Sequence, residues 1–165
     1  MVHHLPSLDA YAVYLDGNPD EADLLLRELL IGVTHFFRDD EAFAVLRAQV
    51  LPALLARAGE PRSLRAWVAG CSSGEEAYSL AIVIDELLTE QHADDVQVLI
   101  YATDLDKNAI ATARVGRYPA EIEARVSPAR LARYFVRDDG SYRISSAIRS
   151  KVVFAHPDLI SDPPF

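Results

Sequence analysis

The chain has 165 residues, of which 50% are hydrophobic and 25% charged, and its formal net charge is −9. This length allows one hydrophobic core of ordinary size, and a single cysteine excludes a disulfide framework and a cysteine-based zinc site. No basic segment followed by an apolar one opens the chain, and no apolar run reaches the ~18 residues of a membrane span. We therefore expect a cytoplasmic protein with no signal peptide and no membrane insertion.

The charge is unevenly distributed. Residues 1–106 hold 6 basic and 19 acidic side chains, whereas residues 107–151 hold 10 basic and 4 acidic ones. A chain this acidic is a poor binder of nucleic acid, so we expect no nucleic-acid partner. The basic segment is either an ordinary solvated face or a docking surface for an acidic partner, and both interpretations remain open.

Helices are expected in the N-terminal third. The sequence Asn18-Pro19-Asp20-Glu21 is a typical helix start with acidic residues in its first turn, and leucines at helical spacing follow it. A second helix is predicted over residues 39–57, with Pro52 expected to kink it or end it early. Gly59-Glu60-Pro61 predicts a linker. Residues 1–58 are therefore expected to form a small helical region.

Strands and helices alternate after this linker. The predicted elements are a strand over 64–69, a helix from Glu75, a second strand over 96–102 and a second helix capped by Asp106. This order predicts an α/β fold built on a doubly wound parallel sheet.

Residues 117–150 are interpreted as an insertion before a third strand over 151–154. Ser127-Pro128 predicts the start of a short helix, and a turn over 138–141 predicts a hairpin. Three strands are fewer than a doubly wound sheet usually has. We therefore expect a second domain over 59–165 that is C-terminally incomplete, and a chain that is a fragment.

The turn between the first strand and its helix has the composition of a ligand site. Gly70 and Gly74 let the backbone approach a ligand to which the helix amides also point. Glu75 and Glu76 begin that helix and would repel a pyrophosphate but attract an ammonium or sulfonium group, which favours S-adenosylmethionine over NAD, FAD or ATP. Asp104, at the end of the second strand, is placed to bind ribose hydroxyls. Taken alone, the turn also fits an ordinary strand-to-helix connection whose carboxylates suit the helix dipole.

Three motifs together resemble the CheR family of chemoreceptor glutamate methyltransferases. Thr34-His35-Phe36-Phe37-Arg38 is similar to the family's Thr-x-Phe-Phe-Arg signature, residues 69–79 (AGCSSGEEAYS) to its glycine motif, and Ala102-Thr103-Asp104-Leu105-Asp106 to its ribose-binding strand end. The motifs follow one another with the family's spacing. The sequence around them looks most like the CheR modules that are fused to CheB-type methylesterase domains.

The resemblance implies a fold, a reaction and a set of site residues. The fold is a class I S-adenosylmethionine-dependent methyltransferase (Rossmann-like) domain with an N-terminal helical domain and an inserted β-subdomain. The reaction is methylation of receptor glutamates in chemotaxis signalling, with S-adenosylhomocysteine as a product. Arg38 is implied at the methyl-transfer centre and no metal is implied; the implied cofactor contacts are Thr34, Arg38, Gly70, Gly74, Glu75, Glu76, Asp104, Asp158 and Leu159.

The resemblance also implies a partner. The β-subdomain faces the receptor in this family, and its positive balance here fits the glutamate-rich cytoplasmic helices of a chemoreceptor. Arg130 and Arg133 are the residues we expect to dock them. The turn over 138–141 is shorter than in the members that hold a receptor pentapeptide, which favours docking without that tether.

Several alternatives remain open. Asp162-Pro163-Pro164-Phe165 resembles a motif of amino methyltransferases acting on DNA adenine, although a proline-rich strand exit explains it as well. A catalytically inactive cofactor- or receptor-binding module is a further alternative, because family segments that follow this motif lie beyond Phe165. Arg38 could instead form a surface ion pair with Asp39 or Asp40. Cys71 is expected to be a small buried thiol.

Overall fold

The structure, a computed structural model, describes residues 5–29, 32–57, 59 and 62–156. The chain divides into two compact units, Met1–Gly32 and Val33–Phe165. This division differs from the boundary that we predicted after residue 58. The reason is packing, because the segment after Gly32 places Phe36, Phe37, Leu51 and Leu55 in the core of the larger unit.

The smaller unit is a pair of helices. Helix α1 spans Leu8–Gly17 and α2 spans Pro19–Leu29. Helix α2 begins where the sequence predicts a helix start. The Tyr11 hydroxyl donates to Glu21 Oε1 at 3.0 Å and so ties the two helices together. The sequence did not predict α1, because its apolar residues do not form a clear stripe along one face. In agreement with this, none of its residues is buried.

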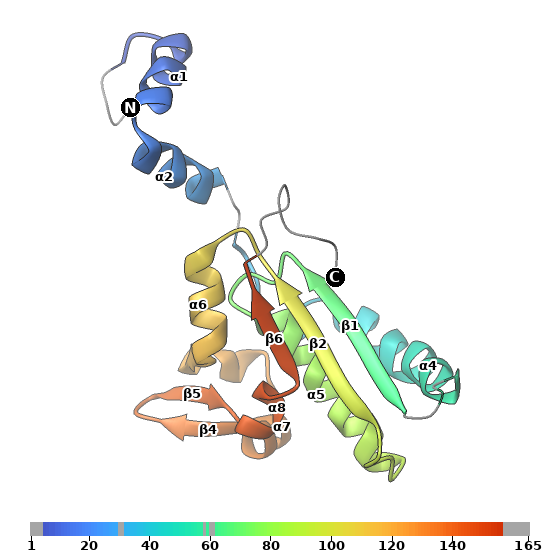
Figure 1. Ribbon diagram of the computed structural model, residues 1–165. Coiled ribbons are helices and arrows are strands. Elements are labelled where there is room, and N and C mark those ends of the chain that lie inside the picture. The colour runs from blue at the N-terminus through green and yellow to red at the C-terminus, as the bar shows by residue number, and fades with distance from the viewer. Residues whose placement is uncertain (1–4, 30–31, 58, 60–61, 157–165) are drawn as a thin grey trace. The chain divides into compact units, whose positions relative to one another are not determined.

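The larger unit is built on a parallel sheet, as predicted. Strands β1 (Ser63–Ala69), β2 (Gln97–Thr103) and β6 (Val152–Ala155) lie in the order β1-β2-β6, and both neighbouring pairs are parallel (Figure 1). Helix α5 (Glu75–Glu90) connects β1 to β2, and α6 (Lys107–Val115) follows β2. This alternation confirms the α/β class.

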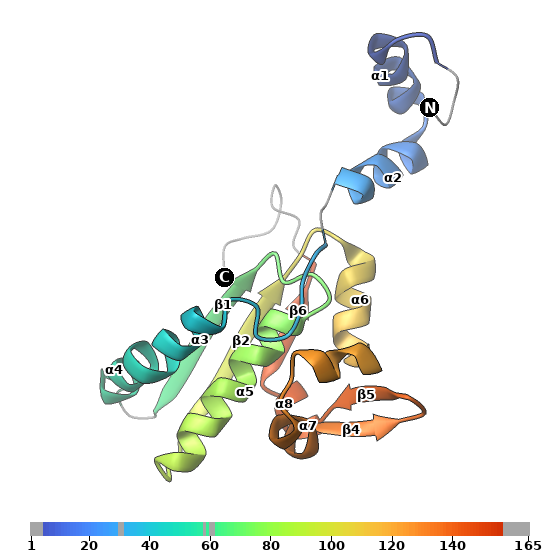
Figure 2. The same ribbon diagram turned by 180° about the vertical axis from the view of Figure 1, so that it is seen from behind.

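The two faces of the sheet differ in burial. Strand register places Val68, Ala102 and Phe154 on one face, all buried, and α5 lies across that face (Figure 2). Trp67 and Val153 lie on the opposite face and are 59% and 44% exposed. Figure 1 looks onto this open face. Helix α5 therefore covers one side of the sheet, the side on which the core of the larger unit forms.

The helix predicted over 39–57 has three parts. Helix α3 (Asp40–Val45) passes into a π-helical turn, η1 (Leu46–Val50), and then into α4 (Leu51–Arg57). Pro52 does not end it. The wider π turn just before Pro52 already interrupts the regular hydrogen-bond ladder, and so the missing proline N–H is tolerated.

The insertion predicted over 117–150 is an antiparallel sheet with short helices. It contains β3 (Arg117–Pro119), the 3₁₀ helix η2 (Ala120–Ala124), α7 (Pro128–Tyr134), β4 (Phe135–Asp138), β5 (Ser141–Ile144) and α8 (Ser146–Arg149). The strand order is β3-β5-β4, so the predicted hairpin is present as β4 and β5. Ser127 caps α7 by accepting from the Arg130 amide. Among the described helices, none is long and apolar enough to cross a bilayer.

Candidate functional site

The glycine turn, residues 70–74, lies at the carboxyl ends of β1 and β2. Gly70 and Gly74 have φ angles of +69° and +94°, and Ser72 between them also has a positive φ of +48°. A Cβ at Gly74 would lie 2.9 Å from Ala113 Cβ, whereas the space beside Gly70 is open to 4 Å. Gly74 is therefore required by packing, and Gly70 leaves room for a ligand at the strand end.

Asp104 lies directly against this turn. Its Oδ2 accepts from the Ser72 amide at 2.7 Å, and its Oδ1 accepts from the Asp106 amide at 2.8 Å. Each carboxylate oxygen has a second acceptor position, so two positions remain for other donors. The side chain is partly buried and is fixed in orientation before any ligand binds.

Glu75 and Glu76 begin α5, as predicted, but they face different surroundings. The Ser73 hydroxyl lies 2.7 Å from Glu75 Oε2 and donates to that carboxylate, which is partly buried. Glu75 shares a cavity of about 320 Å³ with Thr34, and Glu76 shares one of about 310 Å³ with Arg38. Four of the predicted cofactor residues thus lie near one helix start, in two groups.

The segment from Thr34 to Arg38 passes alongside α5. Phe36 is buried and packs edge-on against Tyr118, with ring centroids 4.8 Å apart. The Phe37 amide donates to Ser79 Oγ at 2.9 Å, which fixes the segment to the helix. The Arg38 guanidinium donates to the Val33 carbonyl at 2.8 Å, a contact that the sequence did not predict.

Unfavourable backbone angles gather at this site. Phe37, Asp39 and Ser72 are non-glycine residues with φ angles of +52°, +63° and +48°. Phe37 and Asp39 flank Arg38, and Ser72 lies within the glycine turn. Such angles cost of order 1–3 kcal/mol each and persist only where surrounding contacts hold them, which is frequent at functional sites.

Arg130 and Arg133 of α7 bind within the chain. Arg130 makes a two-bond ion pair with Glu86 at 2.8 Å for each bond, and its guanidinium lies over the Phe37 ring. Arg133 Nη2 donates to Thr89 Oγ1 at 2.8 Å. Both side chains therefore attach the insertion to α5, and the receptor-docking role that we predicted for them has to compete with these contacts.

Cys71 is a buried thiol within the glycine turn, as expected. It is 1% exposed, and burial followed by the nearby Asp104 carboxylate raises its pKa to about 12. A thiol held protonated in this way is a poor nucleophile. Cys71 therefore contributes to the packing of the turn and is not a candidate nucleophile.

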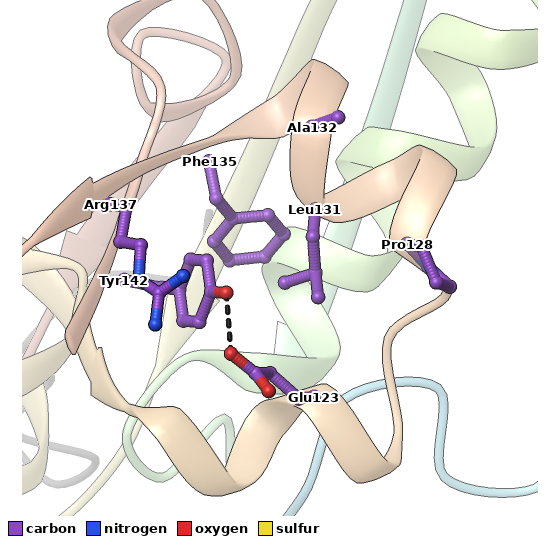
Figure 3. A pocket seen from close by; sticks show the side chains of 7 residues that line it. All are labelled: Glu123, Pro128, Leu131, Ala132, Phe135, Arg137 and Tyr142. Carbon is purple, nitrogen blue, oxygen red and sulfur yellow. Dashed lines mark hydrogen bonds between the residues drawn. The ribbon is translucent and has the colours of Figure 1, made fainter. Parts of the chain in front are cut away.

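Other site features were missed by sequence analysis. Tyr118 donates from its hydroxyl to the Ser73 carbonyl, and Arg125 lines the cavity that holds Thr34 and Glu75. The insertion has a further cavity of about 490 Å³, in which the Tyr142 hydroxyl donates to Glu123 beside the ring of Phe135 (Figure 3). No predicted site residue lines that cavity. Asp158 and Leu159 lie outside the described residues.

Comparisons with known proteins identify the family to which this chain is similar. Residues 32–165 match the family described as CheR methyltransferase, SAM binding domain. The chain is 40% identical over 164 residues to an uncharacterized 104.1 kDa protein of Rhodobacter capsulatus, covering 99% of this chain and 17% of that protein. It is 40% identical to chemotaxis protein methyltransferase 1 of Pseudomonas aeruginosa over 82% of this chain and 52% of the relative.

A more distant relative gives the same match. Chemotaxis protein methyltransferase of Listeria innocua is 34% identical over 84% of this chain and 52% of its own length. This chain thus spans about half the length of these two named methyltransferases.

Proposed function

Since the chain belongs to the CheR methyltransferase family, as part of its S-adenosylmethionine-binding domain, we propose that it transfers a methyl group to glutamate side chains of a chemoreceptor. The observation that carries this proposal is the glycine turn, which has two carboxylates on the following helix and Asp104 held against it. Two of the three relatives named above are chemotaxis protein methyltransferases, and the third is an uncharacterized protein. They do not favour the DNA adenine alternative, and its motif lies outside the described residues.

The residues around the turn fit S-adenosylmethionine. Open space beside Gly70 admits a ligand, and the free acceptor positions of Asp104 suit the two ribose hydroxyls. Glu75 and Glu76 provide the negative charge that an ammonium or sulfonium group requires. We assign the ribose to Asp104, the methionine end to the two glutamates with Thr34, and the adenine end to Asp158 and Leu159.

Transfer needs little proton chemistry from this chain. When bound, S-adenosylmethionine supplies an electrophilic methyl group, which the acceptor carboxylate takes as a methyl ester. A glutamate with an ordinary pKa of ~4.3 is ionised at neutral pH, so no general base is required. Arg38 is proposed to orient this carboxylate, because a guanidinium has five N–H donors and only one is used in the contact with Val33.

The receptor is proposed to dock on the exposed face of the insertion. Arg117 and Arg143 are paired in register on that face and are about half exposed. Both bind Asp138, at 2.8 and 2.6 Å, so two guanidinium groups share one carboxylate and the cluster keeps a positive charge. This charge suits the glutamate-rich cytoplasmic helices that we propose as the partner, and the proposed reaction would take place in the cytoplasm.

Calorimetric binding of S-adenosylhomocysteine tests the cofactor part of the proposal. Asp104→Ala is expected to abolish binding, since it removes the acceptor for the ribose. Asp106→Ala is the matched control, because Asp106 caps α6 through the Asn108 amide and its loss costs about 1 kcal/mol of stability without touching the ligand. A folded chain that binds nothing would refute the proposal for this chain.

Methyl transfer is tested with labelled S-adenosylmethionine and the cytoplasmic helices of a chemoreceptor. Base-labile label on the receptor is the expected result, and Arg38→Ala should remove it. Label that survives mild base would contradict a methyl ester.

A further inference from the structure

Tyr118 lies where three segments of the larger unit meet. It belongs to β3, the first strand of the insertion, and its hydroxyl donates to the Ser73 carbonyl at 2.8 Å. Its ring is 3% exposed and packs edge-on against Phe36 and against Tyr78, with centroids 4.8 and 6.3 Å away. One side chain thus touches the insertion, the glycine turn and the segment that leads to Arg38.

The hydrogen bond from Tyr118 reaches the part of the turn in which the backbone angles are strained. Ser73 lies between Ser72, which has a positive φ, and Gly74, and its own hydroxyl donates to Glu75. The turn is also held by β2 and its end, where the Cys71 amide donates to the Thr103 carbonyl and the Ser72 amide to Asp104, and by the Gly74 amide, which donates to the Cys71 carbonyl. Within the described part of the chain, Tyr118 makes the only hydrogen bond between the insertion and residues 70–74.

We propose that Tyr118 is a positioning residue that holds the glycine turn in its ligand-binding shape and makes cofactor affinity depend on the seating of the insertion. The proposal rests on the cofactor site proposed above. Tyr118 would touch the turn and not the reacting atoms. Movement of the insertion, for example when a receptor docks on it, would reach the turn through this bond.

The Tyr118 hydroxyl is suited to hold the turn permanently. Burial raises the pKa of Tyr118 well above its ordinary value, with a smaller contribution from the Glu75 carboxylate, so the group stays protonated and remains a donor. Without it, the Ser73 carbonyl would lose a buried partner and the strained angle at Ser72 would have less support.

Tyr118→Phe tests the proposal, with Tyr78→Phe as its matched control. Tyr78 is also a buried tyrosine that donates to a backbone carbonyl at 2.8 Å, but its partner is Ala113 in α6. Each variant therefore loses one buried hydroxyl bond, and the two should lose similar stability. Calorimetry with S-adenosylhomocysteine should show affinity lowered about five- to tenfold by Tyr118→Phe, the value of one such bond, and changed less than about twofold by Tyr78→Phe.

Amide hydrogen exchange of the ligand-free chain gives a second measurement. Tyr118→Phe should speed exchange at the amides of residues 72–75, and Tyr78→Phe should not. Equal loss of affinity in both variants, or unchanged affinity and exchange in Tyr118→Phe, would overturn the proposal. If the unmodified chain does not bind S-adenosylhomocysteine, the proposed function fails, and the exchange measurement still decides whether Tyr118 holds the turn.

Discussion

The guanidinium of Arg130 lies 4.0 Å from the ring centroid of Phe37. Phe37 has a positive φ and immediately precedes Arg38, and the stacked guanidinium is itself held by Glu86. An arginine of the insertion thus helps to hold the backbone angle that sets the direction of Arg38. The stacking of Arg130 on Phe37 therefore joins the insertion to the proposed methyl-transfer centre.

Replacing Arg130 tests how much its contacts with Phe37 and Glu86 contribute to stability. Arg130→Gln should lower the free energy of unfolding by about 1–3 kcal/mol, since it removes both the stacking and a partly buried ion pair. Urea unfolding measures the loss. Arg133→Gln is the control, and a change below about 1 kcal/mol is expected because its ion pair is half exposed. Equal losses in the two variants would contradict the special role of Arg130.

The two glycines of the turn should respond differently to alanine. Gly70→Ala meets open space and should cost about 1–2 kcal/mol, the strain of a positive φ alone. Gly74→Ala should cost about 1–3 kcal/mol more, since its Cβ would overlap Ala113 and Phe154. Thermal or urea unfolding ranks the two. The reverse order would show that the turn is packed differently.

The raised pKa of the Cys71 thiol predicts that the folded chain loses stability at high pH. Its pKa is about 12 in the folded chain against an ordinary value of 9.0, so between these values only the unfolded chain releases the proton. This contribution to stability is therefore complete below pH 9 and falls above it, by at most about 1.4 kcal/mol per pH unit. Urea unfolding from pH 8 to pH 10.5 should show a shallower fall for Cys71→Ala. Identical slopes would mean that the thiol is not the group that titrates.

Charge reversal on the insertion tests the proposed docking surface. Arg117→Glu with Arg143→Glu should slow association with an acidic receptor fragment several-fold, roughly tenfold at low salt, and the difference should shrink as salt is added. Arg57→Glu changes the charge on an exposed arginine of α4 and serves as the control. Surface plasmon resonance at two salt concentrations distinguishes them. Similar slowing by both would point to net charge rather than to this face.

Local signals explain most of the correct predictions. Asp106 and Ser127 each accept a hydrogen bond from a backbone amide at the start of a helix, as their positions before α6 and α7 predict. The buried strand β2 follows from its continuous apolar run. These features depend on residues close together in the chain, and a single sequence contains that information.

Long-range contacts explain what was missed. Arg130 stands in a basic segment, and nothing local distinguishes a docking arginine from one that binds Glu86, 44 residues earlier. The bond from Tyr118 to Ser73 spans 45 residues. The boundary between the two compact units differs from the predicted one for the same reason, because the helices after Gly32 look amphipathic whichever unit they pack against. The glycine turn before α5 was predictable because Gly70, Gly74 and the two glutamates that follow are close together in sequence, and its cofactor role stays a prediction.

The open face of the sheet has an optical consequence. Trp67 is the only tryptophan of the chain, and it lies on this face with its indole N–H donating to Thr103 Oγ1 at 3.0 Å. Thr103 immediately precedes Asp104, so the indole stands close to both the uncovered strands and the proposed ribose contact. Its fluorescence therefore reports, without any added label, whatever comes to cover that face.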